Sequence, residues 1–450
     1  MTEITTENLL EIMDENPVNP VKLHDMALSM NIVDIAEAFE FLAREQVIQV
    51  FRFLPKSMAA DVFSYLDPLD QQTIVEDLTD AEIGKIIGEL FADDAVDFIE
   101  EMPANVVKRV LRNVSEDKRQ LINQLLQYPE DSAGSIMTVE FIDLKEEMTV
   151  AAAFDRIRRT GVNKETIYTC FVVRRDRVLA GVVTVKDLLL SEQNALIGDI
   201  MDKNIIFAHT TDDQEAIAAL FTKYGMLSLP IVDKEERLVG IVTIDDVVQI
   251  IEEEATEDFE LMAAITPSED PYLKTSVLTH SRNRVGWLMF LMITATITAA
   301  IMDKYEEALI ALPVLYVFVP MLMDTGGNAG SQSATMIIRG IAVGEIKTKN
   351  VLTVLWREVR IGFLCAIMLG AVNFMRVYLM NGQDYMLCAA VTLSLIATIM
   401  LAKTTGCLLP LLAHKLKIDP AIMAAPLITT IVDSASLIIY FAIAQAILHI

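Results

Sequence analysis

A single carboxylate stands in the middle of a long apolar run near the carboxyl end of the chain. Asp433 lies within residues 421–448, which apart from Gln445 are otherwise apolar or hydroxyl-bearing, and no basic residue is near it in the sequence. A carboxylate at this depth of a membrane is costly unless it faces water, a partner group or an ion. We therefore expect Asp433 to bind a cation. The alternative is a buried, protonated acid that ties two helices together.

A glycine-rich segment, residues 320–335, follows another apolar run. It places Gly326 and Gly327 between two oxygen-bearing side chains, Asp324 and Asn328. The glycines suit a tight turn or a close contact between helices, and irregular backbone at membrane depth needs cover from protein or a water-filled cavity. Carboxylate, amide and carbonyl oxygens suit Mg²⁺, which keeps several of its waters. The segment predicts a pore-lining metal site, with simple helix packing as the alternative.

These residues belong to the apolar half of a chain whose charge is concentrated in the other half. The 450 residues carry a net charge of -27, yet 53% are hydrophobic. Carboxylates crowd the part before about residue 275, and the long apolar runs follow it. Such acidity excludes nucleic acid as a partner, because its phosphates need Lys and Arg, and it suits cations. The four dispersed cysteines indicate neither disulfides nor a zinc site.

The amino-terminal part, residues 1–130, predicts short helices with polar breaks. Apolar residues recur at three- and four-residue spacing in 58–66, 81–91 and 104–114. Loosely repeated helical units of this kind predict a small acidic α-helical solenoid. The first residues lack the apolar core of a signal peptide, so we expect this half in the cytoplasm.

Residues 131–245 contain a two-fold repeat of strands and helices. Each unit opens with an Ile-Met pair and closes in a strand-to-helix turn of the pattern GxVTxxD, at 181–187 and 240–246. This α/β duplication resembles a tandem pair of cystathionine-β-synthase (CBS) modules, which serve as ligand sensors. The resemblance implies ATP binding at Asp187 and Asp246, which end the two turns, with a helix cap as an equal alternative.

Five apolar runs follow a polar connecting helix at residues 246–275. A helix needs roughly 20 apolar residues to span a bilayer, so residues 276–450 predict an all-α transmembrane domain with five spans. The runs are 285–302, 308–323, 361–375 (extended at both ends), 386–402 (running on to about 413) and 421–448. Lys and Arg gather in alternate loops, so the positive-inside rule puts the amino terminus in the cytoplasm and the carboxyl terminus outside the cell membrane.

Two further segments extend the resemblance to nearly the whole chain. TGGNAGSQSATMIIRG (325–340) and DPAIMAAPLITTIVDSASLIIY (419–440), with the helical and CBS-like parts before them, resemble the MgtE family of magnesium channels and transporters. The resemblance implies a homodimer with one pore, a largely hydrated Mg²⁺ at Asp433, and a connecting helix that plugs the pore when intracellular Mg²⁺ is high. Ser331 and Ala425 replace Asn residues of some relatives, which bears on ion coordination.

The carboxylates of the first half predict a divalent-cation sensor. Like charges repel, so a bridging cation would favour a compact arrangement and its loss would open it. Asp93 and Asp97 lie one helical turn apart and share a face. Taken singly, each acid is better explained as solvated surface, and only their collective density favours a sensor. The candidates are Asp61, Asp93, Asp97, Asp213, Glu215, Asp245, Asp246, Glu254, Glu257 and Asp258.

Together these features predict a magnesium-selective channel or transporter, gated by intracellular Mg²⁺ and serving magnesium homeostasis, and no enzyme. No P-loop or phosphorylated-Asp motif is present, so permeation should be passive. Two alternatives stay open, an ion-coupled divalent-cation exchanger and a membrane-anchored nucleotide sensor without transport. Mn²⁺, Co²⁺, Ni²⁺ and Zn²⁺ also accept oxygen ligands. Lys403, deep in the fourth run, could snorkel, pair with Asp324 or line the pore.

Overall fold

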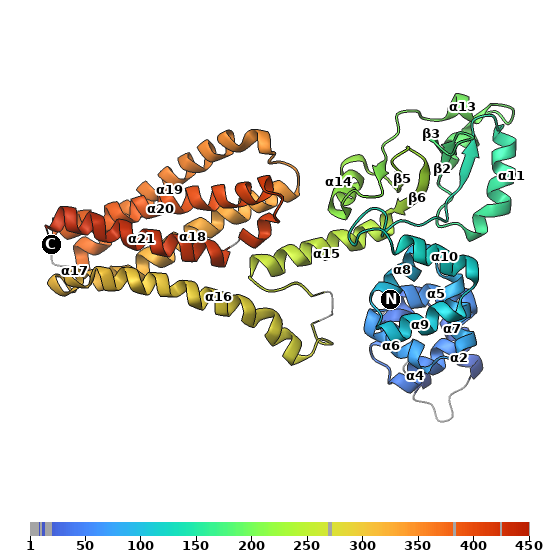
Figure 1. Ribbon diagram of the computed structural model, residues 1–450, viewed down its shortest axis with the longest axis horizontal. Helices are drawn as coiled ribbons and strands as arrows, with labels where there is room; N and C mark the ends of the chain where they lie inside the picture. The colour runs from blue at the N-terminus through green and yellow to red at the C-terminus, as the bar shows by residue number, and fades with distance from the viewer. Residues whose placement is uncertain are drawn as a thin grey trace. The chain divides into compact units, whose positions relative to one another are not determined.

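The computed structural model describes residues 9, 11–13, 20–268, 272–380, 384–423 and 425–449 (Figure 1). Contacts along the chain divide it into two compact units, residues 1–251 and 252–450. Each unit has its own hydrophobic core, and each is described by itself.

Short helices form the first part of the first unit. In the described residues they are α2 (Pro20–Ser29), α3 (Ile32–Phe39), α4 (Arg44–Phe53), α5 (Lys56–Ser64), α6 (Pro68–Asp77), α7 (Asp80–Glu89), α8 (Ala92–Glu100), α9 (Ala104–Asn113) and α10 (Glu116–Leu125). Polar caps separate them: Asp67 accepts from the N–H of Asp70 to start α6, and Thr79 with Glu82 forms a capping box on α7.

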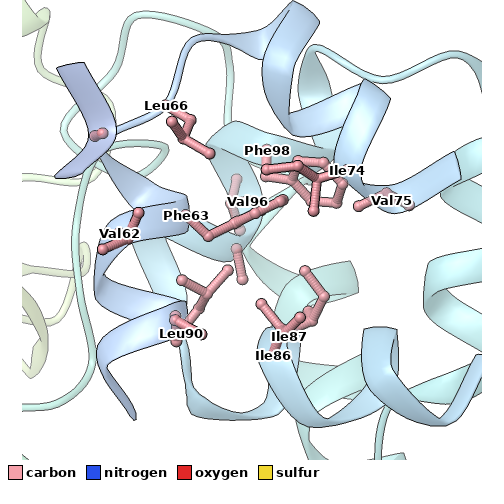
Figure 2. Packing of buried hydrophobic residues seen from close by; sticks show 14 of the residues in the cluster. Val62, Phe63, Leu66, Ile74, Val75, Ile86, Ile87, Leu90, Val96 and Phe98 are labelled. Atoms are coloured by element: carbon pink, nitrogen blue, oxygen red, sulfur yellow. The ribbon is translucent and has the colours of Figure 1, made fainter. Parts of the chain in front are cut away.

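The apolar faces of these helices pack mainly against the helix two places along the chain, as in α3 with α5, α5 with α7 and α8 with α10. Figure 2 shows the centre of this core, where the rings of Phe63 and Phe98 meet edge to face at 5.1 Å between centroids. The predicted helical domain is therefore present. Its description as a solenoid stays a prediction.

The strands of the first unit form two three-stranded sheets. The first contains β1 (Asp143–Lys145), β2 (Thr169–Val173) and β3 (Leu179–Thr184), with α11 (Val150–Thr160), η1 (Gly161–Asn163), α12 (Val185–Leu190) and α13 (Ile197–Ile200). The second contains β4 (Ala208–His209), β5 (Ser228–Val232) and β6 (Leu238–Thr243), with α14 (Gln214–Tyr224). In each sheet the first pair is parallel and the second antiparallel, so the predicted two-fold repeat of strands and helices is present.

The two repeats exchange their opening segments. Thr138, beside the first Ile-Met pair, bridges to Ile241 of the second sheet. A Cβ on Gly240 would lie 2.6 Å from the sulfur of Met137, and one on Gly181 would lie 2.5 Å from that of Met201. The glycine of each GxVT turn is thus required because a methionine from the other repeat fills the space.

The connecting helix, α15 (Ile244–Met262), is 19 residues long. It ends earlier than the predicted segment 246–275, and the described residues between Met262 and α16 form turns and irregular backbone.

Long helices make up the second unit. They are α16 (Val277–Lys304), α18 (Leu315–Ala342), α19 (Val351–Met380), α20 (Tyr385–Lys415) and α21 (Ala425–Leu448), with the shorter α17 (Glu306–Ala311), η2 (Thr348–Asn350) and η3 (Pro420–Met423). In the described residues, four helices are long and apolar enough to cross a membrane: α16, α19, α20 and η3 with α21. The predicted count of five spans is not confirmed, because polar residues interrupt the apolar character of α18.

The glycine-rich segment is helical throughout and lies inside α18. The tight turn that we considered is therefore wrong, and the close helix contact is confirmed. A Cβ on Gly406 of α20 would collide with the carbonyl oxygen of Gly330 in α18, and one on Gly330 would lie 2.7 Å from Ile428 of α21. Glycines thus let α18 approach both α20 and α21.

Candidate functional site

The membrane acids come together where α18 packs against α21. Gly326 faces Val432 and Ser436 of α21, and Gly327 faces Thr429. This contact brings the turn of α18 that carries Asp324 next to the middle of α21. The structure therefore joins residues that are about a hundred positions apart in the sequence.

Asp324 and Asp433 are close enough for the two carboxylates to repel each other. Asp433 is half-buried, whereas Asp324 and Asn328 are exposed on the outside of the helix bundle. Within the described residues, neither carboxylate has a hydrogen-bond donor or a cationic side chain as partner. Two unneutralised carboxylates on adjoining helices, with an amide one turn away, suit a cation that keeps part of its water shell.

The glycines and hydroxyls around these acids are already occupied by the helices. The carbonyl of Gly327 accepts a hydrogen bond from Ser331 Oγ at 2.9 Å, in addition to belonging to the helix. The hydroxyls of Thr429 and Thr430 both donate to the carbonyl of Pro426. Gly326 and Gly327 therefore act as packing residues here. Ala425 begins α21, and its side chain lies outside the described part.

A second concentration of acids lies in the first unit. Asp93 and Asp94 occupy the first turn of α8, where the helix dipole favours negative charge. The carboxylate of Asp246, in the first turn of α15, accepts a hydrogen bond from Thr243 Oγ1 at 2.6 Å. Glu165 reaches the same group from the loop after η1, and its Oε2 is buried without a hydrogen-bond partner. These acids affect one another although they come from three separate parts of the chain.

The shared environment raises the pKa values of these acids. Burial, followed by the charge of Asp246, raises the pKa of Asp93 well above its ordinary range and that of Asp94 to about 7. Burial and the charges of Asp246 and Asp245 raise the pKa of Glu165 to about 8. Burial raises the pKa of Asp246 to about 6. The fold therefore favours the protonated, neutral form of these carboxyl groups over the ionised form.

A largely buried cation, Lys118, partly offsets the negative charge of this cluster. Lys118 donates from Nζ to the carbonyl of Leu90 at 2.6 Å and lies 4.0 Å from Glu140 Oε1. Its charge lowers the pKa of Asp94, although burial remains the larger effect there. In the described part of the chain, no three His, Cys, Asp or Glu side chains are close enough to hold a metal ion as they stand. A cation would have to draw the acids together.

The remaining predicted sensor acids divide into three kinds. Asp61, Asp97 and Asp245 belong to this cluster, because each raises the pKa of Asp94, Asp93 or Glu165. Asp213 instead caps α14, accepting from the N–H of Glu215 at 2.9 Å.

The third kind lies in the second unit, toward the end of α15. Burial, followed by the charges of Asp419 and Glu254, raises the pKa of Asp258 to about 6. Glu257 lies on the same helix. Asp258 and Asp419 therefore form a second, smaller pair of neighbouring acids.

Sequence reasoning missed Asp94, Glu165, Glu140, Lys118 and Asp419. Asp94 could have been found, since it adjoins Asp93 at a helix start. Glu165 gave no signal, because a loop residue far along the chain reaches the cluster only through the tertiary fold.

The two CBS-like turns use their acids as helix caps. Asp187 accepts from the N–H of Thr184 at 3.0 Å and from its hydroxyl at 2.6 Å. Asp246 accepts from Thr243 in the corresponding way. The cap alternative is thus present in both turns, and nucleotide binding there stays a prediction.

A helix bundle with unneutralised acids on two adjoining helices, preceded by a duplicated α/β segment and an acidic helical domain, defines a class of multidomain membrane protein. Comparisons with known proteins specify the family. The sequence matches the divalent cation transporter family (MgtE) over residues 319–443, the MgtE intracellular N domain over 30–131, and the CBS domain over 133–193 and 197–253. The chain belongs to the MgtE family.

Individual relatives are similar over the full length. Magnesium transporter MgtE of Thermus thermophilus is 33% identical, covering 100% of both chains, and that of Bacillus subtilis is 30% identical, covering 93% of this chain and 95% of the relative. A crystal structure of the cytosolic domain of the Mg²⁺ channel MgtE in complex with ATP matches with a TM-score of 0.51 and 31% identity, covering 56% of this chain and 100% of that one.

Proposed function

We propose that the protein transports Mg²⁺ passively across the cell membrane, along a path that passes Asp324 and Asp433. The observation that supports this is the pair of neighbouring carboxylates without a counter-ion on the α18–α21 surface. The relatives in Thermus thermophilus and Bacillus subtilis are magnesium transporters by name. A membrane carboxylate that no protein group neutralises is best explained by a bound or passing cation.

The path is completed by a second copy of the chain. Asp324 and Asn328 face outward from a single bundle, where lipid would otherwise meet them. A homodimer that places two such surfaces opposite each other would surround the path with four carboxylates. The amino-terminal half lies in the cytoplasm and the carboxyl terminus outside, in accord with the distribution of Lys and Arg.

Transport is gated by intracellular Mg²⁺. Asp93 is buried and Glu165 is partly buried, and the mutual repulsion of the acids around them opposes the compact form. A divalent cation that binds the compact form would shift the population toward it, and the pair Asp258 and Asp419 would bind Mg²⁺ in the same way. Asp213 and Glu215 remain predicted sensor acids, and Asp213 also caps α14.

ATP binds at the CBS pair in this proposal. Support comes from the solved cytosolic domain of a Mg²⁺ channel MgtE, which is described in complex with ATP. Asp187 and Asp246 would contribute indirectly, because their carboxylates fix the starts of α12 and α15.

Flux of Mg²⁺ into proteoliposomes tests the proposal. Asp433→Asn keeps the size of the side chain and removes its charge, so flux should be abolished. Asp303→Asn, at an exposed acid at the end of α16, should transport like the unmodified chain. Rising Mg²⁺ on the cytoplasmic face should reduce flux.

Other outcomes would favour the rival functions. Normal flux in Asp433→Asn would overturn the proposed path. Flux that depends on a Na⁺ or proton gradient would favour an exchanger. No flux from the unmodified chain under any condition would favour an anchored nucleotide sensor.

A further inference from the structure

Lys403 is a buried cation inside a membrane helix. Its side chain in α20 is 6% exposed, so it does not snorkel to the surface. Its Nζ donates to Oε1 of Gln332 in α18 at 3.2 Å, and within the described residues no carboxylate, Asp324 included, forms an ion pair with it. An ammonium at membrane depth with one neutral partner is costly, and such residues are usually functional.

Three helices combine to make room for this side chain. The close approach of Gly406 to Gly330 brings α20 against α18 one turn from Lys403. On the α19 side, a Cβ on Gly362 would lie 3.2 Å from the Cβ of Lys403. The lysine stem therefore occupies space that a larger residue at position 362 would take.

A carboxylate lies in the same layer of the bundle. Glu358 of α19 accepts a hydrogen bond at 2.6 Å from the hydroxyl of Ser333, the residue after Gln332. Glu358 lies one turn before Gly362, the residue of α19 that packs against Lys403, and among the described residues no ion pair joins Glu358 to Lys403.

Gln332 connects Lys403 to the polar face of α18. Asp324, Asn328 and Gln332 are all exposed, and their four-residue spacing puts them on one face of the helix, with roughly 6 Å of rise between successive members. One end of this face carries the acid that adjoins Asp433. The other end carries Gln332, which accepts a hydrogen bond from the ammonium of Lys403.

We propose that Lys403 is a specificity-determining residue that weakens the hold of the α18 face on divalent cations. This inference rests on the transport function proposed above. Repulsion by a fixed positive charge grows with the charge of the ion, so a divalent cation is affected twice as strongly as a monovalent one. Fast conduction needs a site that an ion can also leave, and Lys403 opposes tight retention by Asp324 and Asp433.

Concentration dependence of flux tests this proposal. Lys403→Met has similar length, and apolar replacement of a buried charge is often neutral or stabilising. In Lys403→Met, the Mg²⁺ concentration for half-maximal flux should fall by about fivefold or more, and the half-maximal concentration for a monovalent cation should change less. A purely structural role would not separate the two ions. Lys403→Arg and Lys415→Met, the latter exposed on the same helix, should resemble the unmodified chain.

Lys403→Gln provides a second variant should Lys403→Met not fold, because its amide can still hydrogen-bond Gln332. Equal half-maximal concentrations for Mg²⁺ in the folded neutral variants and the unmodified chain would overturn the role of Lys403 alone. Absence of Mg²⁺ flux from the unmodified chain would overturn the transport function itself, and with it this inference.

Discussion

Asp94 and Glu165 are acids whose protonation at neutral pH differs from that of free carboxylic acids. Their pKa values are raised from 3.8 to about 7 and from 4.5 to about 8, mainly by burial. The folded state therefore holds protons that the unfolded chain has released. By linkage, this contribution to stability is present below the unfolded pKa values and is lost as pH rises toward the folded ones.

We expect the amino-terminal half to unfold at a lower temperature at pH 8 than at pH 6 when no divalent cation is present. Added Mg²⁺ should reverse the difference at pH 8, because it neutralises the same acids. Circular dichroism of the full chain in detergent measures the transition. Glu165→Gln should flatten the pH dependence, whereas Glu235→Gln, an exposed acid of the CBS pair, should leave it unchanged. An equally steep dependence in both variants would contradict the role of Glu165.

Residue-level prediction from the sequence names candidates where one element supplies them. Asp93 and Asp97 are candidates because helical spacing puts them on one face, and Asp433 is a candidate because an acid inside an apolar run is conspicuous. The proximity of Glu165 to Asp93, and of Asp324 to Asp433, depends on packing between distant segments. Spacing along the chain carries no information about such contacts.

Helix α18 is the element in which the sequence allowed two opposite readings. Glycines in an apolar run are compatible with a turn and with close helix packing, and composition alone does not decide between them. The neighbouring helices decide between them, since Ile428 of α21 lies where a side chain at position 330 would be, and Gly330 of α18 lies where a side chain at position 406 would be. The sequence shows where the glycines are, but only the structure shows that they serve a contact between helices.

Gly406→Ala should destabilise the bundle by roughly 1–3 kcal/mol, because its Cβ would overlap the backbone oxygen of Gly330, which cannot rotate away. Thermal unfolding of the detergent-solubilised protein would measure the loss. Gly286→Ala in α16 is the matched control, since a Cβ there meets nothing within 4 Å. A transition temperature as high for Gly406→Ala as for Gly286→Ala would show that the α18–α20 contact is looser than described.

The whole molecule follows the order of domains that hydropathy and repeats predicted: acidic helices, a duplicated α/β segment, then long apolar helices. The count of five spans from hydropathy is not confirmed, because polar residues reduce the apolar character of α18. Pairing with a second copy had no signal in the residues themselves. It is motivated by an exposed polar face that one chain leaves uncovered.

If two copies enclose the path, Asn328→Cys should be joined to the same residue of a second copy by a short bismaleimide in native membranes. Leu379→Cys, exposed on α19, should not be joined, because it lies on a different helix of the bundle. Electrophoresis under reducing conditions distinguishes the products. Equal linkage at both positions would indicate random collision, and linkage only at Leu379→Cys would place the interface elsewhere.

The exchange of Met137 and Met201 between the two repeats has a consequence for how this segment tolerates cutting. Each sheet contains a glycine notch that only the opposite half of the sequence can fill. A break between residues 190 and 197 would therefore yield two fragments that are each incomplete, yet complementary. Added together, the two fragments should reassemble. The two repeats therefore form one folding unit and do not fold as two independent domains.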